Sequence, residues 1–159
     1  MTESKYIWMD GEFVNWHDAK VHVLSHTLHY GNGAIEGTKA YKTVDGRCAI
    51  FKLNEHTQRL LNSSKMTLMN VPFTLEELNK AQIELLQKNE LFDGAYIRPL
   101  VYLGYGVMGL YHKEAPVKVS VSAWEWGAYL GEEGLRKGVR VKISSFTRTP
   151  NTSGMGKAK

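Results

Sequence analysis

One short stretch of the sequence carries an imidazole and a guanidinium at helical spacing. His56 and Arg59 lie three residues apart in Asn54-Glu-His-Thr-Gln-Arg-Leu-Leu61, so a helix would place both on one face. A guanidinium near the positive end of a helix is suited to binding a phosphate group. The alternative is an ordinary arginine on a solvated helix surface, and the spacing alone favours that alternative.

A second set of polar side chains alternates along an apolar stretch. In Ala95-Tyr-Ile-Arg-Pro-Leu-Val-Tyr102, a strand would direct Tyr96, Arg98 and Tyr102 to one face and the apolar residues to the other. Phenols and a guanidinium are groups that bind a carboxylate ligand. An arginine paired with a structural carboxylate is an equally good interpretation. Pro99 predicts that this strand lies at an edge or a bulge, where functional sites are common.

Two further segments contain residues that could do chemistry. Trp124-Glu-Trp-Gly-Ala-Tyr-Leu-Gly131 is typical either of a loop lining an apolar pocket or of core filling. His22, His26 and His29 have a spacing compatible with one helix face. No carboxylate or cysteine joins them at the spacing of metal ligands, so we interpret them as structural and expect no metal.

Strands and helices must position these residues, and the first third of the chain predicts strands. Asp10-Gly11 and Asp45-Gly46 are hairpin turn signals between apolar runs. The expected hairpins pair residues 6–9 with 12–16 and residues 35–43 with 48–53. The histidine-rich segment 18–31 between them fits neither a plain core segment nor a plain loop.

Two helices are expected in the middle of the chain. Asn54 is the predicted N-cap of a helix that runs to about Met69. Its core-facing side chains would be Leu60, Leu61, Leu68 and Met69. Thr74-Leu-Glu-Glu77 is a capping box that opens a second helix, which ends near Asn89.

The last third predicts three more strands, at residues 95–103, 117–123 and 139–146. In the third, Val139, Val141 and Ile143 alternate with polar residues, the pattern of a half-buried strand. Hairpins with grouped helices predict an α+β domain with an antiparallel-rich sheet and two helices. We expect a small N-terminal domain over residues 1–146. Residues 147–159, rich in turn formers, would then be an interdomain linker and the start of a C-terminal domain.

The composition narrows the class of protein. Apolar residues make up 43% of the 159 residues, enough for one domain with a real core. No apolar run approaches the roughly 20 residues that a membrane helix needs. The net charge is +4, but lysines and arginines interleave with acids, so we expect neither nucleic acid nor membrane as a partner. The single cysteine, Cys48, cannot form an internal disulfide, which predicts a reducing, cytoplasmic setting.

Six motifs occur in an order and spacing typical of one family. They are Tyr6-Ile-Trp-Met-Asp-Gly-Glu12, Ala19-Lys-Val-His-Val-Leu-Ser-His-Thr-Leu-His-Tyr-Gly31, Glu36-Gly37, Glu55-His-Thr-Gln-Arg-Leu60, Tyr96-Ile-Arg-Pro99 and Trp126-Gly-Ala-Tyr129. From about residue 6 onward the chain resembles the N-terminal half of branched-chain amino acid aminotransferases, which are fold-type IV enzymes that use pyridoxal 5′-phosphate. The second and sixth motifs favour this family over D-amino acid aminotransferases and aminodeoxychorismate lyases.

The resemblance implies roles for individual residues. Arg59 matches the arginine that binds the cofactor phosphate, and Lys159 matches the lysine that forms a Schiff base with the cofactor aldehyde, with Lys157 as the alternative. Tyr96 and Arg98 match residues around the substrate carboxylate. Residues that match the pocket for the branched side chain are Tyr30, Ile35, Gly37, Trp126 and Tyr129, and Met108 matches a loop that reaches the pocket of the partner subunit.

The resemblance also implies an activity. The enzyme would move amino groups between Leu, Ile or Val and 2-oxoglutarate, giving branched 2-oxo acids and glutamate, as a homo-oligomer. The family usually has Phe at the position of Ile35 and often has Arg at the position of Lys39. The change at Ile35 concerns which substrate side chain is preferred and not which reaction is catalysed. A glutamate that holds the cofactor ring comes from the second half of family members. We therefore expect the 159-residue chain to bind the cofactor weakly and to be inactive alone.

Three other interpretations predict different results. Another fold-type IV activity, of the D-amino acid aminotransferase or aminodeoxychorismate lyase type, would be revealed by assaying L-branched against D-amino acids. A non-catalytic interaction domain would keep the fold without the chemistry, and a natural stop codon after Lys159 would mark it. A basic nucleic-acid module would bind DNA or RNA in a salt-dependent way, which we do not expect.

Overall fold

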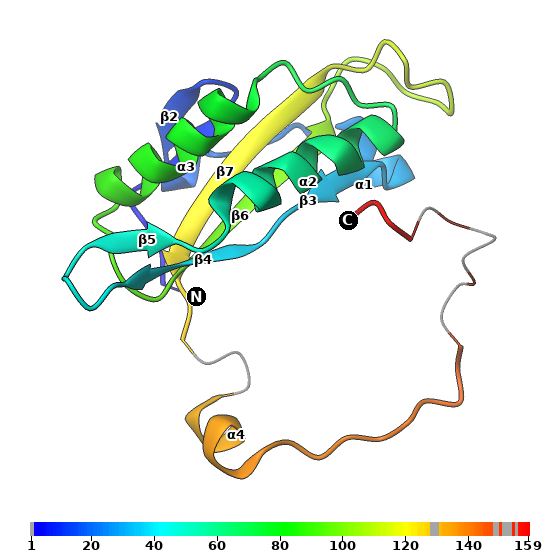
Figure 1. The fold of residues 1–159 in the computed structure, drawn as a ribbon. Helices are drawn as coiled ribbons and strands as arrows, with labels where there is room; N and C mark the ends of the chain where they lie inside the picture. Colours follow the sequence, from blue (N-terminus) through cyan, green and yellow to red (C-terminus); the bar gives the residue numbers. More distant parts are fainter. Residues whose placement is uncertain (1, 128–130, 148–149, 151–153, 155) are drawn as a thin grey trace.

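The chain is built on an antiparallel sheet with two helices on one face (Figure 1). The computed structural model describes residues 2–127, 131–147, 150, 154 and 156–159, and only the backbone of residue 132. In chain order the strands are β1 (Tyr6–Met9), β2 (Glu12–Asn15), β3 (Gly33–Ile35), β4 (Thr38–Lys42), β5 (Cys48–Ile50), β6 (Ala95–Leu103) and β7 (Val117–Glu125). Their order in the sheet is β2-β1-β7-β6-β4-β5, with β3 also paired to β6.

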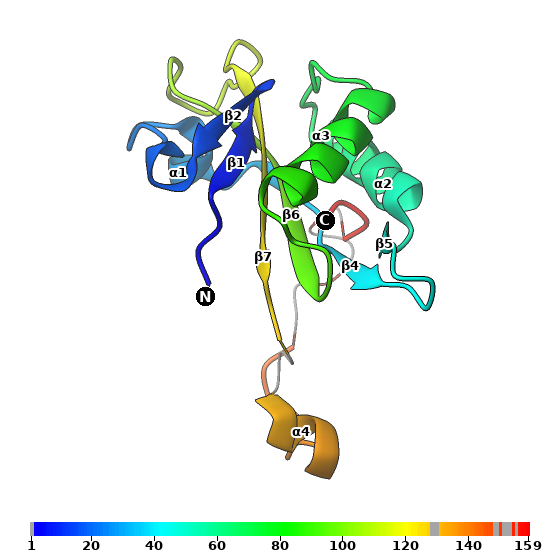
Figure 2. The ribbon, with the colours of Figure 1, turned by 90° about the vertical axis from the view of Figure 1, so that its left-hand side faces the viewer.

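The helices are η1 (Trp16–Asp18), which is a 3-10 turn, α1 (His26–Tyr30), α2 (Leu53–Met66), α3 (Leu75–Lys88) and α4 (Gly131–Lys137). Helices α2 and α3 lie side by side against the same face of the sheet (Figure 2). The core between them and the sheet includes Leu60, Leu85, Ile97 and Val121, all of which are fully buried. This arrangement confirms the predicted α+β class. No helix among the described residues is long and apolar enough to span a bilayer.

The first predicted hairpin is confirmed. Strand β1 pairs with β2 from Tyr6–Asn15 to Met9–Glu12. Asp10 and Gly11 have φ values of 49° and 103°. Two successive left-handed residues form a tight turn whose twist matches that of the flanking strands.

The second hairpin, between β4 and β5, is also confirmed, but its predicted first strand is divided. Glu36 and Gly37 separate β3 from β4, and both strands pair with β6. Pro99 was predicted to mark an edge or a bulge. Strand β6 pairs with β7 along its other side, so the prediction of an edge is wrong. Pro99 lies opposite the break, where its carbonyl accepts from Glu36 N at 3.0 Å. Its missing N–H would point to the same side, so the interrupted ladder tolerates a proline in an interior strand.

Helix α2 begins differently from the prediction. Its N-cap is Lys52, at φ 52° and without a side-chain cap bond, and Asn54 lies inside the helix. Asn54 is not the cap because its side-chain oxygen accepts a hydrogen bond from α3 instead. Leu60 and Met69 are buried as expected and Leu61 packs against the core, whereas Leu68 is 78% exposed. Leu68 follows the end of the helix at φ 60°, so its direction is no longer set by the helical period.

The predicted strand at residues 139–146 is absent from the described structure, and this expectation is wrong. The segment follows α4 and lies apart from the sheet (Figure 1). Val141 and Ile143 are 90% and 95% exposed. Alternating valines predict a strand only where a neighbouring strand can bond to the backbone and a surface can cover the apolar face. Neither is present for this segment among the residues that the structure describes.

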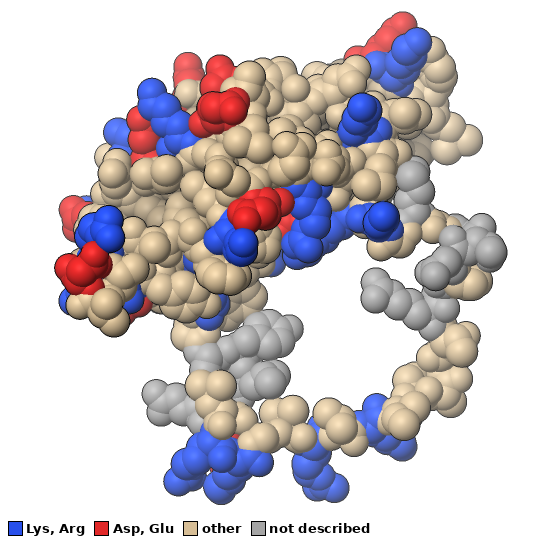
Figure 3. Space-filling model, viewed as in Figure 1, with Lys and Arg blue, Asp and Glu red and all other residues tan. Residues whose placement is uncertain are grey.

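Charged side chains are mixed over the helices and strands on the face shown in Figure 3. Lys and Arg side chains there lie next to Asp and Glu. Lysines and arginines predominate from α4 onward, at Arg136, Lys137, Arg140 and Lys142.

Candidate functional site

A buried carboxylate lies where β3 ends and β4 begins. The side chain of Glu36 has no exposed surface. It accepts two hydrogen bonds from Arg59, one from Nε and one from Nη2 at 2.7 Å. His56 Nδ1 lies 2.8 Å from Glu36 Oε2, and Lys159 Nζ lies 3.7 Å from the same oxygen. Two basic side chains from one helix and a third from the far end of the described chain therefore meet at one carboxylate.

Helix α2 supplies two of these side chains and a third contact. His56, Arg59 and Ser63 recur at the spacing of one helix face. Ser63 is fully buried, and its Oγ accepts a hydrogen bond from Lys159 N at 3.1 Å. Ile35 N donates to Lys159 O at 2.9 Å. Residue 159 is thus held between α2 and β3.

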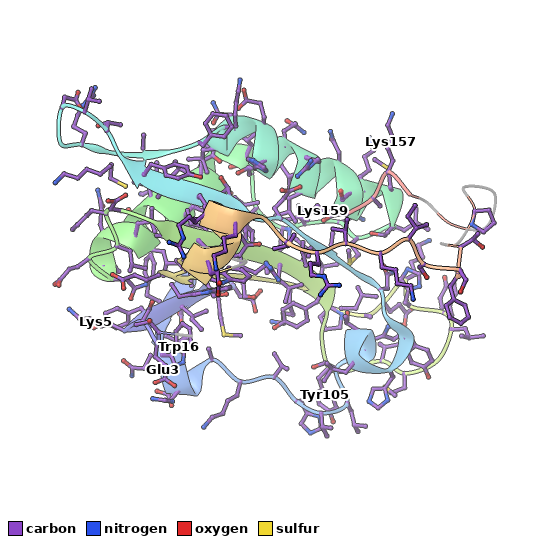
Figure 4. All side chains as sticks on the ribbon, turned by 90° about the horizontal axis from the view of Figure 1, so that it is seen from below. Glu3, Lys5, Trp16, Tyr105, Lys157 and Lys159 are labelled. Carbon is purple, nitrogen blue, oxygen red and sulfur yellow. The ribbon has the colours of Figure 1, made fainter. Side chains whose placement is uncertain are left out.

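The two lysines near the end of the described chain differ in direction. In Figure 4, Lys159 lies between α2 and the sheet, whereas Lys157 points outward. Of these two described lysines, it is the Lys159 amine that forms an ion pair with Glu36.

The environment of Glu36 keeps it ionised. Burial alone would raise the pKa of this carboxyl. Hydrogen bonds from Arg59 and His56, with the positive charges of Lys159 and Arg59, outweigh burial and lower the pKa to about 2. The hydrogen bond to Glu36 in turn raises the pKa of Arg59 above its ordinary value. The charged forms of both partners are therefore stabilised.

Arg59 has hydrogen-bonding capacity left over. A guanidinium carries five N–H groups in a planar fork, and Glu36 occupies only the edge formed by Nε and Nη2. The Arg59 side chain is 50% exposed. Its remaining N–H groups can bind a second anion, and a phosphate matches their geometry.

A second cluster lies on the sheet around Tyr96. Its hydroxyl accepts from Arg98 Nε at 3.1 Å and from Arg98 Nη2 at 2.8 Å. Its ring packs against Trp126 in a T-shaped arrangement, with 4.7 Å between ring centroids, and against Trp124 at 5.1 Å. A Cβ at Gly37 would lie 2.1 Å from the Tyr96 hydroxyl oxygen, so only glycine leaves room for the phenol there. The break between β3 and β4 thus links the two clusters, through Glu36 to one and through Gly37 to the other.

Comparison with known proteins identifies the family. Residues 33–159 match the sequence family described as amino-transferase class IV. The chain belongs to the class IV aminotransferases. The resemblance that the six motifs indicated is confirmed.

Individual relatives of this class IV aminotransferase chain carry more specific names. The branched-chain-amino-acid aminotransferase of Pseudomonas aeruginosa is 48% identical over 153 residues, which cover 96% of this chain and 49% of the relative. The Escherichia coli protein of the same name is 43% identical over 156 residues, covering 96% and 50%. A crystal structure of the Escherichia coli branched-chain amino acid aminotransferase has a TM-score of 0.90 and 41% identity, covering 96% of this chain and 50% of that one. The chain spans about half the length of the curated relatives it matches.

The structure brings together seven of the predicted site residues. Arg59 and Lys159 meet at Glu36, and Ile35 bonds to the main chain of Lys159. The remaining four form the second cluster: Gly37, Tyr96, Arg98 and Trp126.

Two other predicted site residues, Tyr30 and Met108, meet where α1 contacts the loop between β6 and β7. Tyr30, in α1, accepts a hydrogen bond through its hydroxyl from Gly109 N at 3.0 Å. Met108 precedes this glycine, and both Tyr30 and Met108 are nearly half exposed. His26 also binds the loop, with Nε2 2.8 Å from Gly109 O. Tyr129, the last predicted pocket residue, lies outside the described residues.

Sequence reasoning gave no role to Glu36 or Ser63, although both are central to the geometry. Glu36 appeared there only as part of a family motif. An acid directly before a glycine, inside a stretch of small and apolar residues, was a signal for a buried and paired carboxylate. Ser63 shares the face of Arg59 four residues further along the helix, but serine in a helix is common and carries no such signal.

Proposed function

We propose that this chain is part of a pyridoxal 5′-phosphate-dependent branched-chain aminotransferase, which moves amino groups between Leu, Ile or Val and 2-oxoglutarate. The observation that carries the proposal is the convergence of Arg59 and Lys159 on Glu36 in a class IV aminotransferase chain. The relatives' names support the substrate class. Two similar branched-chain aminotransferase structures are named with pyridoxamine 5′-phosphate and with N-(5′-phosphopyridoxyl)-L-glutamate, which supports the cofactor.

The residues of the site fit this cofactor. Arg59 has unused N–H groups on a half-exposed guanidinium for the phosphate, and its other edge is fixed by Glu36. The side chain of Lys159 is 44% exposed, so its amine is accessible to an aldehyde. When bound, the cofactor ring supplies an electron sink for the electrons of the substrate Cα–H bond.

Each residue of the chain then has a distinct task. Lys159 Nζ takes the proton from the substrate α-carbon and later returns a proton. Arg98 binds a carboxylate, in particular the distal carboxylate of glutamate, and the Tyr96 hydroxyl fixes the orientation of its guanidinium. Trp126 and Ile35 provide apolar surface for a branched side chain and limit the access of water.

The assembly and setting of the enzyme belong to the same proposal. We propose a homo-oligomer in which the loop that carries Met108 contributes to the site of a neighbouring subunit. The half-exposed position of Met108 is compatible with such a role. A cytoplasmic setting is proposed because the chain has a single cysteine and hence no internal disulfide.

The proposal is tested by transamination assays on an extended chain. The 159 residues are joined in frame to the part of the Pseudomonas aeruginosa relative that follows the matched region. We expect L-Leu, L-Ile and L-Val to react with 2-oxoglutarate, and Lys159→Ala to abolish the reaction. Lys157→Ala, two residues away, is the matched control and should retain it.

Other outcomes contradict the proposal in different ways. A preference for D-amino acids would indicate a D-amino acid aminotransferase, and release of pyruvate from aminodeoxychorismate would indicate a lyase. Equal loss in both lysine variants would contradict the role of Lys159. The isolated 159-residue chain, assayed in parallel, should bind the cofactor weakly and show no turnover.

A further inference from the structure

We propose that Ser63 is a positioning residue for Lys159, because its hydroxyl fixes the main chain from which the lysine side chain extends. Through this contact Ser63 selects Lys159 over Lys157 as the lysine that reaches the cluster at Glu36. The inference rests on the proposed function only for the chemical role of the Lys159 amine.

The geometry of residue 159 carries the inference. Ser63 Oγ accepts from Lys159 N at 3.1 Å, across a separation of 96 residues. Lys159 O accepts from Ile35 N at 2.9 Å. The main-chain N–H of Lys159 is thus held by α2, and its main-chain oxygen is held at the end of β3. The side chain remains 44% exposed with its amine 3.7 Å from Glu36, so the anchor restrains the backbone and leaves the amine accessible.

The described residues just before Lys159 provide little other support. Gly154, Gly156 and Lys157 are exposed, and within this stretch Gly156 N donates to Gly154 O at 3.0 Å. Glycine backbones have a wide range of accessible conformations, so exposed glycines restrain the chain weakly. Two hydrogen bonds at residue 159 therefore decide which lysine is placed beside Glu36.

The neighbouring serine provides a matched control. Ser63 and Ser64 are both fully buried in α2. Ser64 Oγ donates to Leu60 O at 2.9 Å, a bond within the helix that is common for serine. Ser63 accepts from a residue outside the helix instead. The same change to alanine at the two positions separates an effect on Lys159 from an effect on the helix.

The first experiment measures which lysine reacts with an aldehyde. The 159-residue chain is mixed with pyridoxal 5′-phosphate, whose aldehyde condenses with an amine and releases water. Cyanoborohydride then reduces the C=N bond to a stable secondary amine. Peptide mass spectrometry gives the ratio of label on Lys159 to label on Lys157 in the wild type, Ser63→Ala, Ser64→Ala and Ser63→Thr.

We expect the wild type to favour Lys159 and Ser63→Ala to lower the ratio by about fivefold, the effect of one hydrogen bond worth about 1 kcal/mol. Ser64→Ala should leave the ratio unchanged, and Ser63→Thr, which keeps the hydroxyl, should restore it. Equal labelling of the two lysines in the wild type, or an equal loss in the two alanine variants, would overturn the inference.

A second measurement does not involve the cofactor. The amide proton of Ile35 is protected by Lys159 O, so Ser63→Ala should speed its exchange with solvent while Ser64→Ala should not. Unchanged exchange in a folded Ser63→Ala chain would also overturn the inference. Failure of transamination in the extended chain would refute the proposed function and leave both of these results intact.

Discussion

At the scale of single residues, the charge balance of the site depends on Glu36. The change Glu36→Gln removes the negative charge but keeps the shape, so Arg59 and Lys159 lose their counter-charge and His56 loses a carboxylate partner. We expect a loss of about 1–3 kcal/mol in the free energy of unfolding at neutral pH, typical of hydrogen bonds to a charged group. Chemical denaturation measures it. Glu90→Gln, which removes an exposed partner of Lys5, is the control and should change stability by less than about 0.5 kcal/mol.

The same carboxylate predicts a pH dependence. The pKa of Glu36 in the folded chain is about 2, below its ordinary value of 4.5, so the unfolded chain binds more protons between these values. The stabilisation is therefore complete above about pH 4.5. It is lost as the pH falls toward 2. The stability difference between wild type and Glu36→Gln should narrow over this range, and a constant difference in denaturation series from about pH 7 to about pH 2 would contradict the ion pairing.

Gly37 is predicted to be irreplaceable for a steric reason. In Gly37→Ala the new methyl group would lie 2.1 Å from the Tyr96 hydroxyl, whose ring is confined by Trp124 and Trp126. We expect the free energy of unfolding to fall by about 1–3 kcal/mol, as for other overpacked sites. Thermal unfolding measures it. Gly127→Ala, where no atom of the described residues lies within 4 Å of the added carbon, is the control. An equal effect of both changes would show that the cost comes from the backbone and not from Tyr96.

At the scale of helices and strands, short-range sequence signals were sufficient to predict some elements but not others. Asp10-Gly11 and the Thr74–Glu77 capping box predicted their elements because the bonds that form them lie within a few residues. The break at Glu36 and the interior position of Pro99 were missed because both depend on the pairing of β3 and β4 with β6, which is remote along the chain. Asn54 was mistaken for a cap because its partner lies on the neighbouring helix.

The capping box gives a prediction for α3. Thr74 Oγ1 accepts from Glu77 N at 3.2 Å, and Glu77 Oε2 accepts from Thr74 N at 2.7 Å. Thr74→Ala should therefore lower the free energy of unfolding by about 1 kcal/mol, as measured by chemical denaturation. Thr74→Ser keeps the accepting oxygen and should retain most of the stability. Equal stability of the alanine and serine variants would mean that the cap contributes nothing to α3.

At the scale of the whole molecule, the site joins residues that are far apart in the sequence. Glu36, Arg59 and Lys159 come from a strand break, a helix and the last described residue. The resemblance suggested that Arg59 and Lys159 work together, but Glu36, the carboxylate that brings them together, was given no role from the sequence. Spacing reveals which residues share an element, whereas contact between elements depends on the packing of α2 against the sheet.

For residues 139–146 the alternating sequence pattern predicted a half-buried strand, and the exposure found in the structure can be tested directly. The alternating valines of this segment predict burial on one face, yet Val141 and Ile143 are almost fully exposed. The double change Val141→Lys with Ile143→Lys should therefore leave the free energy of unfolding nearly unchanged, within about 0.5 kcal/mol, because exposed positions contribute little to stability. Sedimentation should also show less self-association, since two exposed apolar side chains are removed. A loss above about 1 kcal/mol would mean that the segment packs as a strand after all, since only a buried apolar face makes lysine that costly.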